Sequence, residues 1–78
     1  MNNLDKIYEE NFQIVYKYLL FLTYNEDLAE ELTQETFYRA IKNINNFKEK
    51  SKLSTWLCAI AKNLWIEEIR RNKKQTRT

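Results

Sequence analysis

The chain has 78 residues, no glycine, no proline and no histidine, and its formal net charge is +2. Tight turns and β-hairpins depend on glycine and proline, so this composition excludes all-β and α/β folds as well as glycine-rich phosphate loops. The absence of histidine removes the usual general base and the usual zinc ligand. A hydrophobic content of 44% predicts one globular domain over residues 1–78.

Residues 4–23 predict a first helix, because an apolar residue recurs at every third or fourth position. Asn25 is expected to cap a second helix over residues 26–44, where Glu26 and Asp27 suit the positive end of the helix dipole. The inward face of the first helix is expected to consist of Leu4, Tyr8, Phe12, Val15, Leu19 and Leu22. That of the second is expected to consist of Leu28, Leu32, Phe37, Ala40, Ile41 and Ile44.

Residues 45–52 lack apolar periodicity, which predicts a polar loop before the third helix. The three-and-four spacing resumes over residues 53–71, where Ser51 or Ser54 is the expected cap. The inward face of this helix is expected to consist of Leu53, Trp56, Leu57, Ile60, Ala61, Leu64 and Ile69. Residues 72–78 have no apolar side chain and predict a basic tail. The sequence therefore predicts an all-α fold, a compact bundle of three main helices.

Catalysis is the function class that the sequence supports least. Glu31 and Glu35 stand four residues apart on the second predicted helix, a spacing at which two carboxylates can hold a hard cation. A di-metal site in a helical bundle also needs histidines from other helices, and the chain has none. Acid–base catalysis by paired carboxylates needs a cleft, for which three short helices leave little room. We therefore expect a solvated acidic face with no metal, no cofactor and no enzymatic activity.

The charges divide sharply along the chain. Residues 1–36 hold two cations against eight acids, a net charge of −6, whereas residues 37–78 hold eleven cations against three acids, a net charge of +8. Such asymmetry predicts an acidic surface that suits a basic protein and a basic surface that suits a polyanion. Two hypotheses for the function remain open at this point: a helical domain that binds only protein, and a nonspecific nucleic-acid-binding module.

Localisation follows from what the N-terminus and the single cysteine indicate. The first residues lack a basic segment followed by an apolar core, and no apolar run approaches the length of a membrane span. Cys58 has no second cysteine in the chain with which to form a disulfide, and it lies in an apolar helical pattern. We expect a soluble, cytoplasmic protein without membrane insertion, in which Cys58 is a buried free thiol.

Three short sequence motifs follow one another along the chain. They are AEELTQETFYRA at residues 29–40, FKEKSKLSTWL at residues 47–57 and IAKNL at residues 60–64. Together they resemble region 2 of bacterial sigma factors, and most closely that of the extracytoplasmic-function (ECF) group of the sigma-70 family. The resemblance implies a transcription initiation domain that binds the RNA polymerase core and both recognises and melts the promoter −10 element.

The resemblance implies that the second helix docks on the arginine-rich clamp coiled-coil of the polymerase's largest subunits. Carboxylates and amides suit guanidinium groups, because they accept charge-assisted, often bidentate hydrogen bonds. The positions that match this role are Asp27, Glu31, Leu32, Gln34 and Glu35. Family members are also commonly held by an anti-sigma factor, which is a further expected partner.

The resemblance also implies that the loop at residues 45–52 and the third helix capture flipped bases of the non-template strand. From the residues alone Trp56 favours a core position, but it matches the family's tryptophan at the start of this helix. The expected DNA-binding residues are Asn43, Asn46, Phe47, Lys48, Ser51, Lys52, Trp56, Lys62, Asn63, Arg70 and Arg71.

The sequence departs from the family pattern at a few positions. Glu49 or Lys50 stands where the family often has a loop glycine, Leu53 replaces an aromatic residue, and Ala59 replaces a frequent arginine. We therefore expect the loop to follow a different backbone path. The resemblance further implies a region 4 domain beyond residue 78, which this chain does not contain.

Overall fold

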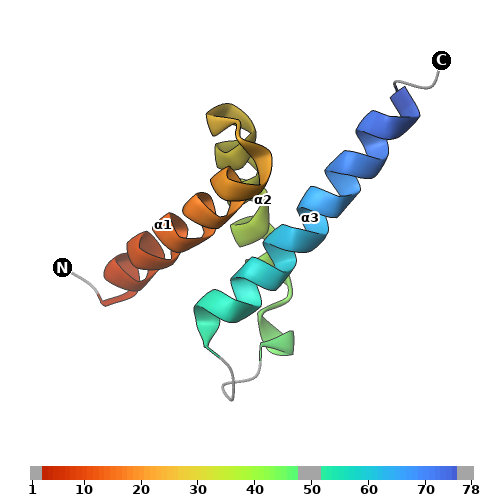
Figure 1. Ribbon diagram of the computed structural model, residues 1–78. Coiled ribbons are helices and arrows are strands. Elements are labelled where there is room, and N and C mark those ends of the chain that lie inside the picture. Colours follow the sequence, from red (N-terminus) through yellow and green to blue (C-terminus); the bar gives the residue numbers. More distant parts are fainter. Residues whose placement is uncertain (1–2, 48–51, 76–78) are drawn as a thin grey trace.

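The computed structural model describes the backbone of residues 3–47 and 52–75, and the side chains of residues 5–47 and 52–72. The elements are α1 (Asn3–Thr23), α2 (Glu26–Lys42), the short 3-10 helix η1 (Ile44–Asn46) and α3 (Leu53–Gln75), shown in Figure 1. No strand occurs among the described residues, and each of the three α-helices contacts the other two. The predicted all-α bundle of three main helices is therefore confirmed.

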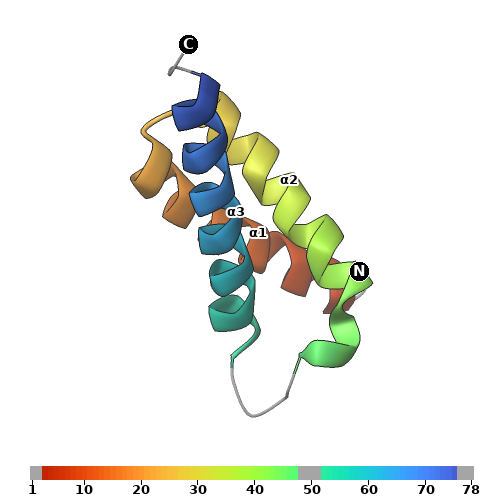
Figure 2. The same cartoon turned by 90° about the vertical axis from the view of Figure 1, so that its right-hand side faces the viewer.

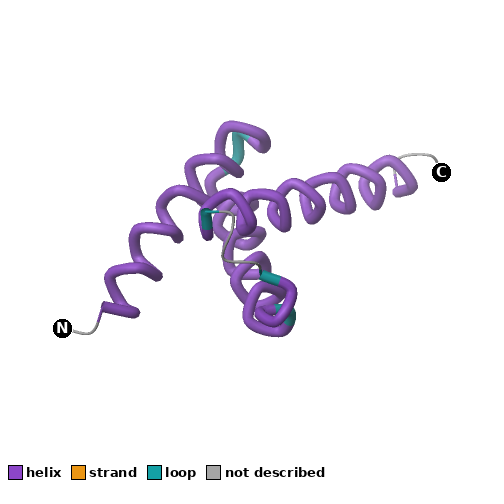
Figure 3. The backbone as a smooth tube through the Cα atoms, turned by 90° about the horizontal axis from the view of Figure 1, so that it is seen from below, coloured by secondary structure: helices purple, strands orange, loops and turns teal. Residues whose placement is uncertain are grey.

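The helices are arranged as an antiparallel pair crossed by a third. Figure 2 shows α2 and α3 running in opposite directions, with α1 crossing them on one side. The C-terminal half of α3 extends past the other helices, as Figures 1 and 3 show. This extension makes the molecule long, with principal extents of 49 × 25 × 17 Å.

The core lies where the three helices meet. Its buried apolar side chains are Val15, Leu19, Ala29, Leu32, Ala40, Leu57, Ala61 and Leu64. Two polar residues of α2, Thr33 and Thr36, are also fully buried. Their hydroxyls donate to the carbonyls of Ala29 and Leu32, at 2.6 and 2.7 Å, so burial leaves neither hydroxyl unsatisfied.

The link between α1 and α2 makes its turn without glycine. Tyr24 adopts a positive φ of 53°, a conformation that costs a non-glycine residue about 1 kcal/mol. Its N–H donates to the carbonyl of Leu20 at 2.9 Å, which closes the last turn of α1. The side-chain oxygen of Asn25 accepts the N–H of Leu28 at 3.0 Å, so the predicted N-cap is confirmed.

Some apolar residues that we expected inside the bundle are exposed. Ile41 is 72% exposed, Ile44 53%, Tyr8 49% and Ile69 37%, so their assignment to the core is wrong. On α2 the buried face consists mostly of small side chains, whereas we expected the large apolar side chains to be buried. The buried residues of this helix are Ala29, Leu32, Thr33, Thr36 and Ala40. The side chain of Leu4 lies outside the described residues.

The ends of the helices differ from the expected bounds. The second helix ends at Lys42, and η1 occupies the start of the expected loop. The third helix begins at Leu53. Its first turn is closed by the N–H of Trp56, which donates to the carbonyl of Lys52 at 3.2 Å. Ser54 therefore lies inside the helix and is not its cap, while Ser51 falls outside the described residues. The helix continues to Gln75, over part of the expected basic tail.

No helix in the described part of the chain is both long enough and apolar enough to cross a bilayer. Cys58 is half-buried on α3, and it forms no disulfide. Partial burial raises the pKa of its thiol above the ordinary value, because desolvation disfavours the thiolate.

We predict that Leu19→Ala lowers the free energy of unfolding by about 3 kcal/mol, because Leu19 is fully buried and its truncation leaves a cavity. Phe21→Ala on the same helix is the matched control. Phe21 is 69% exposed, so its removal should change stability by less than about 0.5 kcal/mol. Urea unfolding followed by circular dichroism measures both values, and equal losses would contradict this description of the core.

Candidate functional site

A polar cavity lies where the C-terminal end of α2, η1 and the first turns of α3 meet. Its volume is about 240 Å³. We call it the asparagine pocket, and its lining residues are Arg39, Asn43, Asn46, Trp56, Ile60 and Asn63. The structure thus brings together the predicted site residues from the end of the second helix, the start of the loop and the third helix.

The asparagine pocket is built from side chains that local structure holds in place. Asn43 caps α2, because its backbone N–H donates to the carbonyls of Arg39 and Ala40, and its side-chain amide N–H donates to the carbonyl of Arg39 at 2.9 Å. Phe47 packs against Trp56, with ring centroids 5.1 Å apart and planes tilted by 39°. Amide groups beside an indole ring supply hydrogen-bonding groups and a stacking surface, which together suit an unpaired base.

Arg39 joins α2 to α3 at the edge of this pocket. Its guanidinium donates to both carboxylate oxygens of Glu67, at 3.1 and 3.3 Å, and its Nε donates to Glu35 at 3.4 Å. These hydrogen bonds, chiefly the ones to Glu67, raise the pKa of Arg39 above its ordinary value. In turn the hydrogen bonds from Arg39 lower the pKa of Glu67 below its ordinary value of 4.5. Arg39 is therefore held as a cation between two carboxylates.

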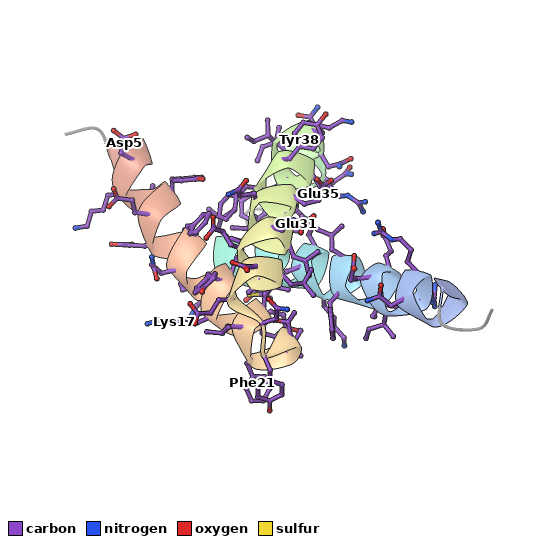
Figure 4. All side chains as sticks on the ribbon, turned by 90° about the horizontal axis from the view of Figure 1, so that it is seen from above. Asp5, Lys17, Phe21, Glu31, Glu35 and Tyr38 are labelled. Carbon is purple, nitrogen blue, oxygen red and sulfur yellow. The ribbon has the colours of Figure 1, made fainter. Side chains whose placement is uncertain are left out.

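A second polar surface follows the outer face of α2. We call it the acidic row, and it consists of Asp27, Glu31, Gln34 and Glu35. A spacing of three or four residues places these side chains on one face of the helix. Figure 4 shows Glu31 and Glu35 succeeding each other along α2. Leu32, which we expected to act with them, is only 6% exposed and packs in the core beneath this face.

The remaining predicted DNA-binding residues lie outside the asparagine pocket. Lys52 is exposed directly before α3, and Lys62 is exposed on that helix beside Asn63. Arg70 and Arg71 are exposed on the extended C-terminal half of α3, where Arg71 pairs with Glu68 at 3.2 Å. Lys48 and Ser51 lie outside the described residues, as do Glu49 and Lys50, the two candidates for the position of the family's loop glycine.

Sequence reasoning missed three residues of this site, Arg39, Ile60 and Glu67. The spacing of Glu35 and Arg39 is that of a helical i, i+4 ion pair, which was a local signal for Arg39. Glu67 lies 28 residues from Arg39 along the chain, so no local pattern could reveal their pairing. Of the departures from the family pattern, Leu53 packs partly buried against the core, and Ala59 is exposed on α3.

The described acidic and thiol side chains do not gather into a group of three that could hold a metal ion. Glu31 and Glu35 instead line a groove of about 280 Å³ between α2 and α3, which also includes Arg39 and Arg71. Two guanidinium groups in this groove compete with any added cation for the carboxylates.

Comparison with known proteins identifies the family of this chain. The family model described as Sigma-70 region 2 matches residues 7–75. The chain is 40% identical over 72 residues to the ECF RNA polymerase sigma factor SigM of Bacillus subtilis (strain 168), covering 92% of this chain and 44% of SigM. It is 45% identical over 69 residues to SigW of the same organism, another ECF RNA polymerase sigma factor, covering 88% of this chain and 33% of SigW.

A third relative is a probable RNA polymerase sigma factor of Haemophilus influenzae (strain ATCC 51907 / DSM 11121 / KW20 / Rd). It is 52% identical over 44 residues, covering 56% of this chain and 23% of that protein. The chain thus spans less than half the length of each of these three relatives. No solved structure gives a significant match.

The chain belongs to the sigma-70 region 2 family, a family of non-enzymatic domains, and its relatives include ECF sigma factors. The resemblance that the three sequence motifs indicated is therefore confirmed.

We predict that Glu67→Gln lowers the thermal midpoint of unfolding at neutral pH, because it removes the charge from the pair with Arg39. Since the pKa of Glu67 is lower in the folded chain than its ordinary value of 4.5, the contribution of the pair is complete above that value. It is lost as the pH falls through the folded-state pKa. The difference in midpoint between wild type and variant should therefore shrink as the pH is lowered from neutral to well below 4.5. A difference that stays constant over this range would contradict the prediction.

Proposed function

We propose that this domain acts in transcription initiation as region 2 of a sigma factor, with two surfaces that bind different partners. The acidic row binds the clamp coiled-coil of the RNA polymerase core. The asparagine pocket and the basic surface of α3 bind the non-template strand of the promoter −10 element. Membership of the sigma-70 region 2 family supports this role, and such a domain works in the cytoplasm, where polymerase and promoters meet.

The observation that carries the proposal is the convergence of chain-distant residues on one pocket. Asn43 follows α2 and Asn46 lies in η1, whereas Trp56 and Asn63 lie on α3, and all of them line the same cavity. The resemblance had assigned these positions to −10 recognition on sequence alone. A core-packing role does not explain why three asparagines are exposed around a half-buried tryptophan.

The chemistry of this pocket is capture of a base, without any reaction. Unstacking a base from a duplex costs a few kcal/mol per step, and aromatic stacking returns about 1–3 kcal/mol per base. The amides of the pocket add hydrogen bonds to the edge of the base, which give sequence dependence. Lys52, Lys62 and Arg70 are exposed cations that neutralise backbone phosphates.

The acidic row supports polymerase binding through its charge and its position. Its carboxylates lie on the part of the chain that carries a net charge of −6, and the helix beneath them is held by Leu32 in the core. Charged hydrogen bonds to arginine are shorter and stronger than neutral ones, so a few of them can dominate an interface of modest size. An anti-sigma factor that covered either surface would block the corresponding step.

We predict that the double substitution Asp27→Asn and Glu31→Gln weakens binding to core polymerase by about tenfold, because two charge-assisted hydrogen bonds become neutral. Its affinity for single-stranded −10 oligonucleotides should not fall. Fluorescence anisotropy with labelled domain measures both affinities. Glu30→Gln is the control, since it removes a neighbouring exposed charge of α2 that lies outside the acidic row. Unchanged polymerase binding by the double variant would refute this surface.

We predict that Asn46→Ala with Asn63→Ala reduces the preference for a −10 oligonucleotide over a scrambled one by about tenfold, because the pocket loses two base-reading amides. Lys62→Ala is the matched control: it should weaken both oligonucleotides equally and reduce the salt dependence by about one charge. Titration of tryptophan fluorescence at two or more salt concentrations measures these effects. Equal binding of −10 and scrambled DNA by the wild type would indicate a nonspecific module, and no binding at low salt would indicate a domain that binds only protein.

A further inference from the structure

A large open cavity between α1 and α2 borders one of the two surfaces of the proposed function. It has a volume of about 690 Å³ and is lined by Tyr8, Glu9, Phe12, Gln13 and Gln34. We call it the aromatic cavity. Gln34 belongs to both the aromatic cavity and the acidic row, so the two are adjacent on the molecule. The other lining residues come from the N-terminal half of α1, which the resemblance did not connect with binding.

The aromatic rings of this cavity are fixed by a third ring from α2. Tyr8 meets Phe37 edge-on with centroids 4.9 Å apart, and Phe12 stacks on Phe37 at 5.8 Å. Tyr8 and Phe12 lie 5.8 Å from each other. Because the cluster holds both rings, they offer a preorganised aromatic surface that loses little conformational freedom when something binds to it.

The charge of the aromatic cavity favours a cation. Glu9 is exposed at its edge, and Gln13 and Gln34 each bring an amide oxygen. In the described part of the chain the ion pairs use Arg39 and Arg71, so none of them neutralises Glu9. A nucleic-acid phosphate would be repelled by this carboxylate and by the net negative charge of residues 1–36.

We propose that the aromatic cavity binds an arginine side chain of the polymerase segment that docks on the acidic row. The planar guanidinium stacks on the rings of Tyr8 and Phe12 and donates hydrogen bonds to the carboxylate of Glu9 and the amide oxygens of Gln13 and Gln34. A lysine ammonium is compact and strongly hydrated, and it cannot combine stacking with a fork of donors in this way. The inference rests on the proposed polymerase binding, and it extends that interface from α2 to α1.

The first test compares two exposed acids of α1 in binding to core polymerase. Glu9→Gln should weaken binding about fivefold, whereas Glu10→Gln should leave it unchanged, because Glu10 lies outside the aromatic cavity. Both variants lose the same charge, and both replace exposed side chains, so a thermal melt should show equal stability. Equal affinities for the two variants would overturn the inference.

This comparison also separates the inference from the proposal on which it rests. If the Asp27→Asn and Glu31→Gln double variant loses affinity while Glu9→Gln does not, the acidic row stands and the aromatic cavity is refuted. If Glu9→Gln alone loses affinity, the acidic row is refuted as the docking surface, and with it the inference that the bound arginine belongs to a segment docked there. If neither variant changes the affinity, both are refuted.

The second test needs no polymerase. The domain is titrated with N-acetyl-arginine amide and, separately, with N-acetyl-lysine amide at millimolar concentrations, and the ring signals of Tyr8 and Phe12 are followed by NMR. The arginine compound should shift these signals in wild type and much less in Glu9→Gln, and the lysine compound should shift them weakly in both. Equal shifts by the two compounds, or no shift by arginine, would overturn the inference.

Discussion

The packing of one face of α2 against both other helices is the constraint on which this structure depends. That face carries small side chains, among them Ala29, Thr33, Thr36 and Ala40, so α1 and α3 both approach the helix closely. The threonine hydroxyls bond back to the carbonyls of the same helix, so their burial leaves no polar group without a partner. Because α1 and α3 both pack against this face, the opposite face of α2 remains exposed along its length. The proposed docking surface and the entrance to the asparagine pocket both follow from that division.

Arg39 stands between the two proposed surfaces. It lines the asparagine pocket on one side and pairs with Glu35 of the acidic row on the other, while Glu67 ties it to α3. The same helix therefore presents carboxylates towards its N-terminal end and the amide of Asn43 at its C-terminal cap, with the guanidinium of Arg39 between them. This order along α2 keeps the acidic row apart from the asparagine pocket, as the proposed separation of polymerase binding from DNA binding requires.

Much of the fold could be predicted from local sequence patterns. Apolar periodicity gave the three main helices, and Asn25 gave the start of α2, because both signals act within a few residues. Ile41 and Ile44 were wrongly assigned to the core. Both faces of this segment carry apolar residues, and periodicity alone does not tell which face is buried. In the structure it is the face with the small residues. For the candidate site, a family resemblance predicted roles for Asn43, Asn46, Trp56 and Asn63, which line one pocket. The pairing of Arg39 with Glu67 and the aromatic cavity instead depend on contacts between distant segments. Such contacts leave no trace in local spacing.

The central claim is that base capture occurs at the asparagine pocket and is separate from the acidic row. The most direct measurement is an NMR titration of the isotopically labelled domain with a single-stranded −10 oligonucleotide. We expect the largest shift changes at the side-chain amides of Asn43, Asn46 and Asn63 and at the indole of Trp56, with little change at Asp27 and Glu31. Shift changes confined to the basic C-terminal end of α3, around Arg70 and Arg71, would contradict the account.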